Sequence, residues 1–255
     1  MGLNQYRIIS FDRQMGVGVA GAMQVTIPAV AKTDSLNAPY CLANELICAE
    51  LARFIRLPVP PCGILRPALP TLPPYFASLD FNFTGNSLPP VDVARCYLEL
   101  PQLSTGLLLF DILVANCDRH RANFAVDFGA APPRMSVFDH SHALLGYTPG
   151  GGTARLRELR STLGCSGALP TGANRHCLLD TISADNYFDE WIDRIQSLPD
   201  YLIAGLCQDA ADIGLAAAEG TATLDFLKYR RDRIRTIIQN NQSEFHSINQ
   251  WRLFQ

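Results

Sequence analysis

The sequence predicts an α+β fold in two parts, a β-rich N-terminal part that holds one helix and a mostly helical C-terminal part. Before residue 85, short apolar runs bounded by turn residues have the length and pattern of strands. Beyond residue 90, apolar residues recur every three or four positions, which is typical of helices. The stretch from Thr84 to Pro90 is rich in turn residues and separates the two patterns. We therefore expect an N-terminal lobe over residues 1–85 and a C-terminal lobe over residues 86–255.

The N-terminal part is predicted to place short strands around a single helix. The helix, residues 41–56, carries bulky apolar side chains on one face and small ones on the other, so we expect it to be covered on most sides. Leu57-Pro58 ends it, because proline cannot continue the hydrogen-bond ladder. Strands are expected at residues 5–12, 23–32 (one or two strands), 63–66 and 75–83.

The C-terminal part is predicted to be helical, with one strand pair at its start. Three glycines at residues 150–152 indicate a flexible segment. Four arginines at residues 230, 231, 233 and 235 are interpreted as the solvated face of the last helix. Helices are expected at residues 91–100, 103–116, 186–197, 200–212 and 221–244, and strands at residues 124–127 and 135–138.

Composition and charge exclude several classes of protein. The 255 residues are 48% hydrophobic and 18% charged, which argues for a packed core and against a disordered chain. A net charge of −3 gives no electrostatic basis for binding nucleic acid or an anionic membrane. The longest apolar stretch, Gly106 to Ala115, is too short to span a membrane, and no secretory signal precedes it. The eight cysteines form no C-x-x-C pair, so we expect free thiols in a cytoplasmic protein.

Four polar residues, at three places in the chain, have the order and spacing of a phosphoryl-transfer site. Asp118 and Asn123 share a loop between an apolar helix and a strand, where a carboxylate base and a metal-binding amide can face one cleft. Asp139 follows the next strand, and with Asn123 it would supply the oxygen ligands that Mg²⁺ prefers. Lys32 ends an N-terminal strand in a chain with only two lysines, and a lysine is a compact charge suited to a phosphate.

These residues, in this order, resemble the HipA-like bacterial kinases over roughly residues 25–145. The resemblance implies a small bilobed protein-kinase-like fold, with ATP and Mg²⁺ as cofactors. The D-R-H-x-x-N loop at residues 118–123 also resembles that of phosphoinositide kinases, which share the fold. The segments that carry the resemblance are Lys32, Leu42-Ala43-Asn44-Glu45-Leu46-Ile47, Glu50-Leu51-Ala52-Arg53, Leu57-Pro58-Val59-Pro60, Phe110-Asp111, Asn116, Asp118-Arg119, Asn123 and Phe138-Asp139-His140.

The resemblance assigns roles in the N-terminal lobe. It implies that Lys32 binds the ATP phosphates and that a helix glutamate holds the lysine. Glu45 matches the family pattern, and Glu50 is the alternative because it lies nearer the bulky face of the same helix. Gly16 and Gly18 match a phosphate-covering glycine loop only approximately.

It also assigns roles in the C-terminal lobe. Asp118 would orient the attacking hydroxyl or accept its proton, and His120 would stabilise charge on the transferred phosphoryl group. Asn123 and Asp139 would hold magnesium. The adenine is expected against the connector near residues 77–81.

Other readings of the same residues remain open. Cys117, His140 and His142 are an alternative zinc site, although their spacing matches no standard zinc pattern. Asp111 lies in an apolar helix and needs a hydrogen-bond partner, so we expect it to brace the loop rather than react.

The sequence therefore predicts an ATP- and Mg²⁺-dependent phosphotransferase, foremost a HipA-like serine/threonine protein kinase. A protein substrate and a possible regulatory partner protein are expected, and a membrane or nucleic acid is not. The alternatives are a lipid or small-molecule kinase with the same site, and a nucleotide-binding pseudokinase without turnover.

Overall fold

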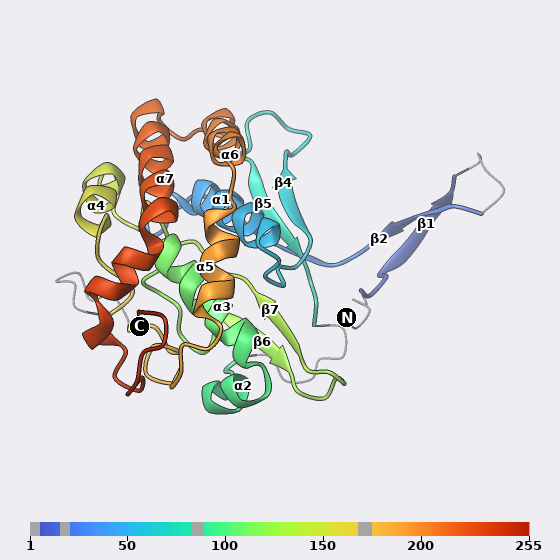
Figure 1. The fold of residues 1–255 in the computed structure, drawn as a ribbon. Helices are drawn as coiled ribbons and strands as arrows, with labels where there is room; N and C mark the ends of the chain where they lie inside the picture. Colours follow the sequence, from blue (N-terminus) through green and yellow to red (C-terminus); the bar gives the residue numbers. More distant parts are fainter. Residues whose placement is uncertain (1–5, 16–20, 83–88, 168–174, 255) are drawn as a thin grey trace.

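The computed structural model describes residues 6–15, 21–82, 89–167 and 175–254, and it confirms the α+β fold (Figure 1). The predicted lobe boundary at residue 85 lies outside the described residues, as do Gly16 and Gly18. Within the described part of the chain, no helix has both the length and the apolar character needed to cross a membrane.

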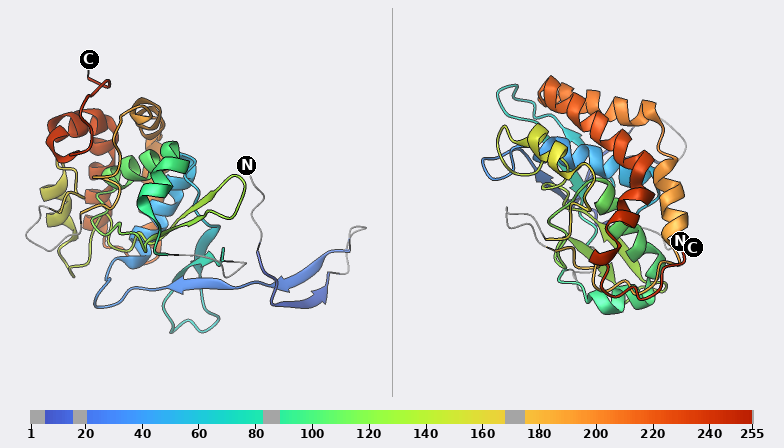
Figure 2. Two further views of the ribbon diagram at one scale, coloured as in Figure 1. Left: turned by 90° about the horizontal axis from the view of Figure 1, so that it is seen from below. Right: turned by 60° about the vertical axis from the view of Figure 1, so that its left-hand side comes forward.

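The N-terminal strands form two separate antiparallel sheets. Strands β1 (Ser10–Gln14) and β2 (Met23–Thr26) pair as a hairpin that projects away from the rest of the chain (Figures 1 and 2). Strands β3 (Ala29–Lys32), β4 (Cys62–Leu65) and β5 (Tyr75–Leu79) form the second sheet in the order β3-β5-β4. The predicted strand at residues 5–12 thus starts later than expected, and residues 23–32 form two strands.

Helix α1 (Cys41–Phe54) is buried on nearly all sides, as its small and bulky faces predict. On one side Leu42 and Ala49 pack with Phe76 of β5. On other sides Ile47 and Leu51 enter the main hydrophobic core, which also holds the apolar residues of the C-terminal helices. Helix α1, which carries Glu45, is therefore fixed by both the sheet and the helical part.

The helical part contains one helix that the sequence pattern does not predict. Of the three glycines interpreted as a flexible segment, Gly152 begins α4 (Gly152–Leu159), a helix that was not predicted. The helix forms because Leu156 and Leu159 are buried in the core, and this packing outweighs the low helix propensity of glycine. The other elements are α2 (Val93–Glu99), α3 (Pro101–Leu113), β6 (Phe124–Asp127), β7 (Arg134–Val137), α5 (Phe188–Gln196), α6 (Asp200–Asp212), α7 (Ala217–Asn240) and a short 3₁₀ helix, η1 (Gln242–Glu244).

Two of the four arginines on α7 are buried, contrary to the prediction of a solvated face. Arg231 donates to the carbonyl of Leu198 and to Asp200. Arg230 is fully buried and satisfies carbonyls at the ends of α3 and α4, which helices leave without intrahelical partners. Burial lowers the pKa of Arg230 to about 10. The carbonyl acceptors of Arg230 belong to Ile112, Leu113, Leu159, Arg160, Thr162 and Leu163.

Candidate active site

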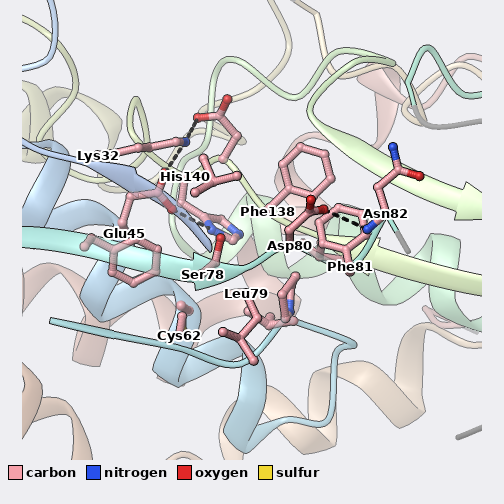
Figure 3. Close-up of a pocket in the computed structure, with 17 residues that line it drawn as sticks. Lys32, Glu45, Cys62, Ser78, Leu79, Asp80, Phe81, Asn82, Phe138 and His140 are labelled. Atoms are coloured by element: carbon pink, nitrogen blue, oxygen red, sulfur yellow. Dashed lines mark hydrogen bonds and ion pairs between the residues drawn. The ribbon is translucent and has the colours of Figure 1, made fainter. Parts of the chain in front are cut away.

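A cavity of about 270 Å³ lies between the three-stranded sheet, α1 and the segment that follows β7 (Figure 3). Lys32, Glu45 and His140 lie together at one side of it, and Asp80, Phe81 and Asn82 lie at the other. The latter three residues follow β5 and overlap the connector at which the adenine was expected. The rest of the lining is largely apolar, as in most pockets for small molecules.

Lys32 is held by two carboxylates. Its Nζ donates to Glu45 Oε1 at 2.6 Å and to Asp139 Oδ1 at 2.8 Å. Glu50 instead pairs with Arg53, so Glu45 is the lysine's partner of the two candidates. Burial would lower the pKa of Lys32, but Glu45 and Asp139 outweigh it and raise the pKa. The lysine is thus a fixed positive charge at the cavity wall.

Asp139 follows β7 and has a left-handed backbone conformation, with a φ of 62°. Its Oδ1 also accepts from Ser141 Oγ at 2.8 Å. Burial raises the pKa of this carboxyl, whereas the Lys32 ammonium and the hydrogen bonds from Lys32 and Ser141 lower it to about 2. Asp139 is therefore ionised at neutral pH, which suits a ligand for a hard cation.

The loop after α3 brings Asp118 and Asn123 into contact. Asn123 Nδ2 donates to the Asp118 backbone oxygen at 2.8 Å and to its Oδ2 at 3.3 Å. The same Oδ2 lies 3.4 Å from His142 Nδ1, and the Asp118 backbone N–H donates to Asn116 Oδ1 at 3.1 Å. His120, in the same loop, is part-exposed, and its Nδ1 accepts from the backbone N–H of Ala122 at 3.2 Å.

Arg119 joins this loop to the Asp139 segment. Its buried guanidinium donates to the backbone oxygens of Asn123 and Phe138. Its Nε donates to Asp111 Oδ2 at 2.7 Å, so a buried ion pair anchors the guanidinium. One side chain thereby holds the backbone at Asn123 and at Phe138, the residue before Asp139, and so links the segments of the two predicted magnesium ligands.

Asp111 braces the loop, as its place in an apolar helix predicts. Besides Arg119, it contacts Asn116 Nδ2 at 3.0 Å and His176 Nε2 at 2.9 Å. Burial raises the pKa of Asp111, but Arg119 and His176 lower it further than burial raises it. Sequence reasoning missed His176, because it lies 65 residues from Asp111 in a segment without a recognisable pattern. The only signal was the need of a buried aspartate for several partners.

The zinc alternative finds no support in the described residues. Cys117 and His142 are joined by a weak contact, from the thiol to the His142 backbone oxygen at 3.7 Å. His140 points instead toward Glu45 (Figure 3). Among the residues that the structure places, no three His, Cys, Asp or Glu side chains form a group that could hold a metal ion.

Comparison with known proteins gives structural similarity only. No model of a protein family matches the chain, and no curated protein matches it. The chain resembles the crystal structure of a Helicobacter pylori proinflammatory kinase, CtkA, with 13% sequence identity and a TM-score of 0.53 over 91% of this chain and 96% of CtkA. HipA, from a Shewanella oneidensis MR-1 complex with HipB and operator DNA, matches at 12% identity and a TM-score of 0.41 over 84% of this chain and 59% of HipA. By its similarity to CtkA, the chain has a kinase-like α+β fold.

Proposed function

We propose that this protein is an ATP- and Mg²⁺-dependent phosphotransferase, of the HipA-like serine/threonine kinase type, that transfers the γ-phosphate to a hydroxyl group. The observation that carries the proposal is the position of Lys32, held between Glu45 and Asp139 at the wall of the cavity. ATP would lie between an N-terminal lobe over residues 1–85 and a C-terminal lobe over residues 86–255. The kinase-like fold supports this reading.

In this proposal the adenine lies at the side of the cavity formed by Asp80, Phe81 and Asn82, and Lys32 binds the phosphates at the other side. Asn123 and Asp139 fit a magnesium ion by their chemistry, since both offer oxygen and Asp139 is held ionised. The ion would neutralise charge on the phosphates as the bond to the leaving group breaks. Gly16 and Gly18 remain candidates for covering the phosphates.

Asp118 is the proposed base. It would orient the acceptor hydroxyl and take its proton. Asn123 stabilises the loop through its hydrogen bonds to Asp118. His120 would face the transferred group with its Nε2, because its Nδ1 already accepts a backbone hydrogen bond. Such positioning accounts for most of the catalysis that phosphoryl transfer requires.

A second candidate is a nucleotide-binding module without turnover. It is favoured by the β1–β2 hairpin, which forms a sheet of its own rather than an extension of the sheet that carries Lys32. A protein substrate and a regulatory partner protein belong to the first candidate, and an interaction partner alone belongs to the second.

The test is transfer of labelled phosphate from ATP in the presence of Mg²⁺, with the protein itself and a panel of hydroxyl-bearing proteins and lipids as acceptors. We expect label with the wild type, and none with Asp118→Asn or Asp139→Asn. The exposed Asp209→Asn on α6 is the matched control and should transfer as the wild type does. ATP binding by the wild type without transfer to any acceptor would favour the second candidate. Undiminished transfer by Asp139→Asn would contradict the site.

A further inference from the structure

His140 lines the cavity and directly follows Asp139 in the chain. Its side chain is 1% exposed, and neither imidazole nitrogen makes a hydrogen bond to a described residue. Buried polar groups are nearly always hydrogen-bonded, because an unpaired one keeps its full desolvation penalty. The imidazole therefore requires a partner within a small movement.

That partner is Glu45 Oε2, the carboxylate oxygen that does not accept from Lys32. His140 Nδ1 lies 3.6 Å from Glu45 Oε2, whereas Glu45 Oε1 accepts from Lys32. An approach of about 0.7 Å would bring the pair to the length of a charge-assisted hydrogen bond. A carboxylate only accepts, so the proton must be on Nδ1. Phe110 supports the ring edge-on, with centroids 5.8 Å apart and planes at 90°.

The contact closes a ring of interactions around the lysine. Asp139 and His140 are neighbours in the chain, and they contact the two partners of one ion pair, Lys32 and Glu45 respectively. Figure 3 shows His140 beside Glu45 and Lys32. Burial alone would raise the pKa of Glu45, but His140 and Lys32 lower it, so the carboxylate is ionised and able to accept from both.

We propose that His140 is a positioning residue, whose Nδ1–H fixes Glu45 so that the other carboxylate oxygen holds Lys32 toward the ATP phosphates. The role in transfer rests on the proposed function, but the hydrogen bond itself does not. His140 touches neither the acceptor nor the transferred phosphate, and it acts through Glu45. It also ties the exit of β7 to α1, so the lysine and the magnesium ligand Asp139 are set together.

Two substitutions separate a hydrogen bond from mere packing. His140→Asn keeps an N–H donor near the position of Nδ1, and His140→Phe keeps the ring but removes the donor. His246→Phe is the matched control, because His246 is exposed and contacts Arg175 and Asp180 far along the chain from the cavity.

The first measurement needs no activity. In ¹⁵N-histidine-labelled, nucleotide-free protein, we expect a downfield imidazole N–H resonance that disappears in His140→Phe, shifts in Glu45→Gln and persists in His246→Phe. A His140 N–H resonance that ignores Glu45→Gln would overturn the proposal. The Glu45→Gln comparison decides the matter even if His140→Phe does not fold.

The second measurement is the steady-state kinetics of transfer. We expect His140→Phe to lose about tenfold in kcat/KM for ATP, and His140→Asn to stay within about threefold of the wild type. Equal loss in both variants, or no loss in His140→Phe, would refute the positioning role. If the wild type transfers no phosphate, the proposed function fails, and the resonance still decides whether His140 holds Glu45.

Discussion

Replacing Arg230 with methionine would remove the only described side chain that donates to the carbonyl ends of both α3 and α4. The substitution keeps the volume of the aliphatic stem and leaves six carbonyl groups, four of them in buried contacts, without this donor. Each hydrogen bond from a charged donor contributes roughly 1.5–3 kcal/mol. Burying the guanidinium costs free energy and offsets part of what these hydrogen bonds contribute. The same burial lowers the pKa of Arg230 to about 10.

The balance predicts a loss of about 3–5 kcal/mol in the free energy of unfolding, because each buried carbonyl left without a donor costs about 1–3 kcal/mol. That is a large part of the roughly 5–15 kcal/mol that stabilises a typical domain. In urea unfolding followed by circular dichroism, the midpoint should fall by roughly 1–2 M. Arg230→Lys, with fewer donors, should lie between the methionine variant and the wild type.

Arg233→Met is the matched control, since Arg233 is exposed on the same helix. It should change the midpoint little, because surface substitutions are usually within about 0.5 kcal/mol. A loss in Arg230→Met no larger than in Arg233→Met would refute the reasoning that the guanidinium holds the two helix ends.

Three further predictions concern the site and the core. The pKa of Asp139 falls from 3.8 to about 2 on folding, so the ionised carboxylate stabilises the folded state fully above pH 3.8. This contribution is lost as the pH falls toward 2, and the unfolding midpoint of Asp139→Asn should therefore decrease less steeply with falling pH than that of the wild type. ATP should protect Lys32, but not Lys228 on α7, from an amine-reactive label in peptide mass spectrometry, and equal labelling with and without ATP would count against the cavity as the nucleotide site. Gly106→Ala would place a Cβ 2.3 Å from the α5 tryptophan ring, so thermal unfolding should show a loss of about 1–3 kcal/mol. Gly205→Ala, with open space around it, should show no loss.

The sequence predicts most elements because their patterns are local. The apolar run of α3 and the alternation of bulky and small side chains in α1 depend only on neighbours in the chain. Helix α4 could not be predicted in this way, since its glycine-rich start indicates a turn and its two core leucines act only after packing. Arg230 was misread for a similar reason, because its carbonyl partners lie about 70 and 118 residues away.

The candidate site is predictable in part. Lys32 and Asp139 are recognisable from their positions at strand ends, and the structure brings them into contact across 107 residues. The choice between Glu45 and Glu50 needed the structure, because both lie on one helix and only the ion pair separates them. His176 carried no local pattern at all.

Helix α1 has a consequence for regulation. Activation in protein kinases commonly moves the helix that bears the glutamate, and so makes or breaks its ion pair with the lysine. Here Ile47, Cys48 and Leu51 on that helix are fully buried in the core it shares with the C-terminal helices. Withdrawing each such side chain costs about 1.5–3 kcal/mol, so an outward swing would cost a large share of the stability of the domain. The pair of Lys32 and Glu45 is therefore assembled by folding itself, and in the proposed kinase an outward movement of this helix would be a costly way to control activity.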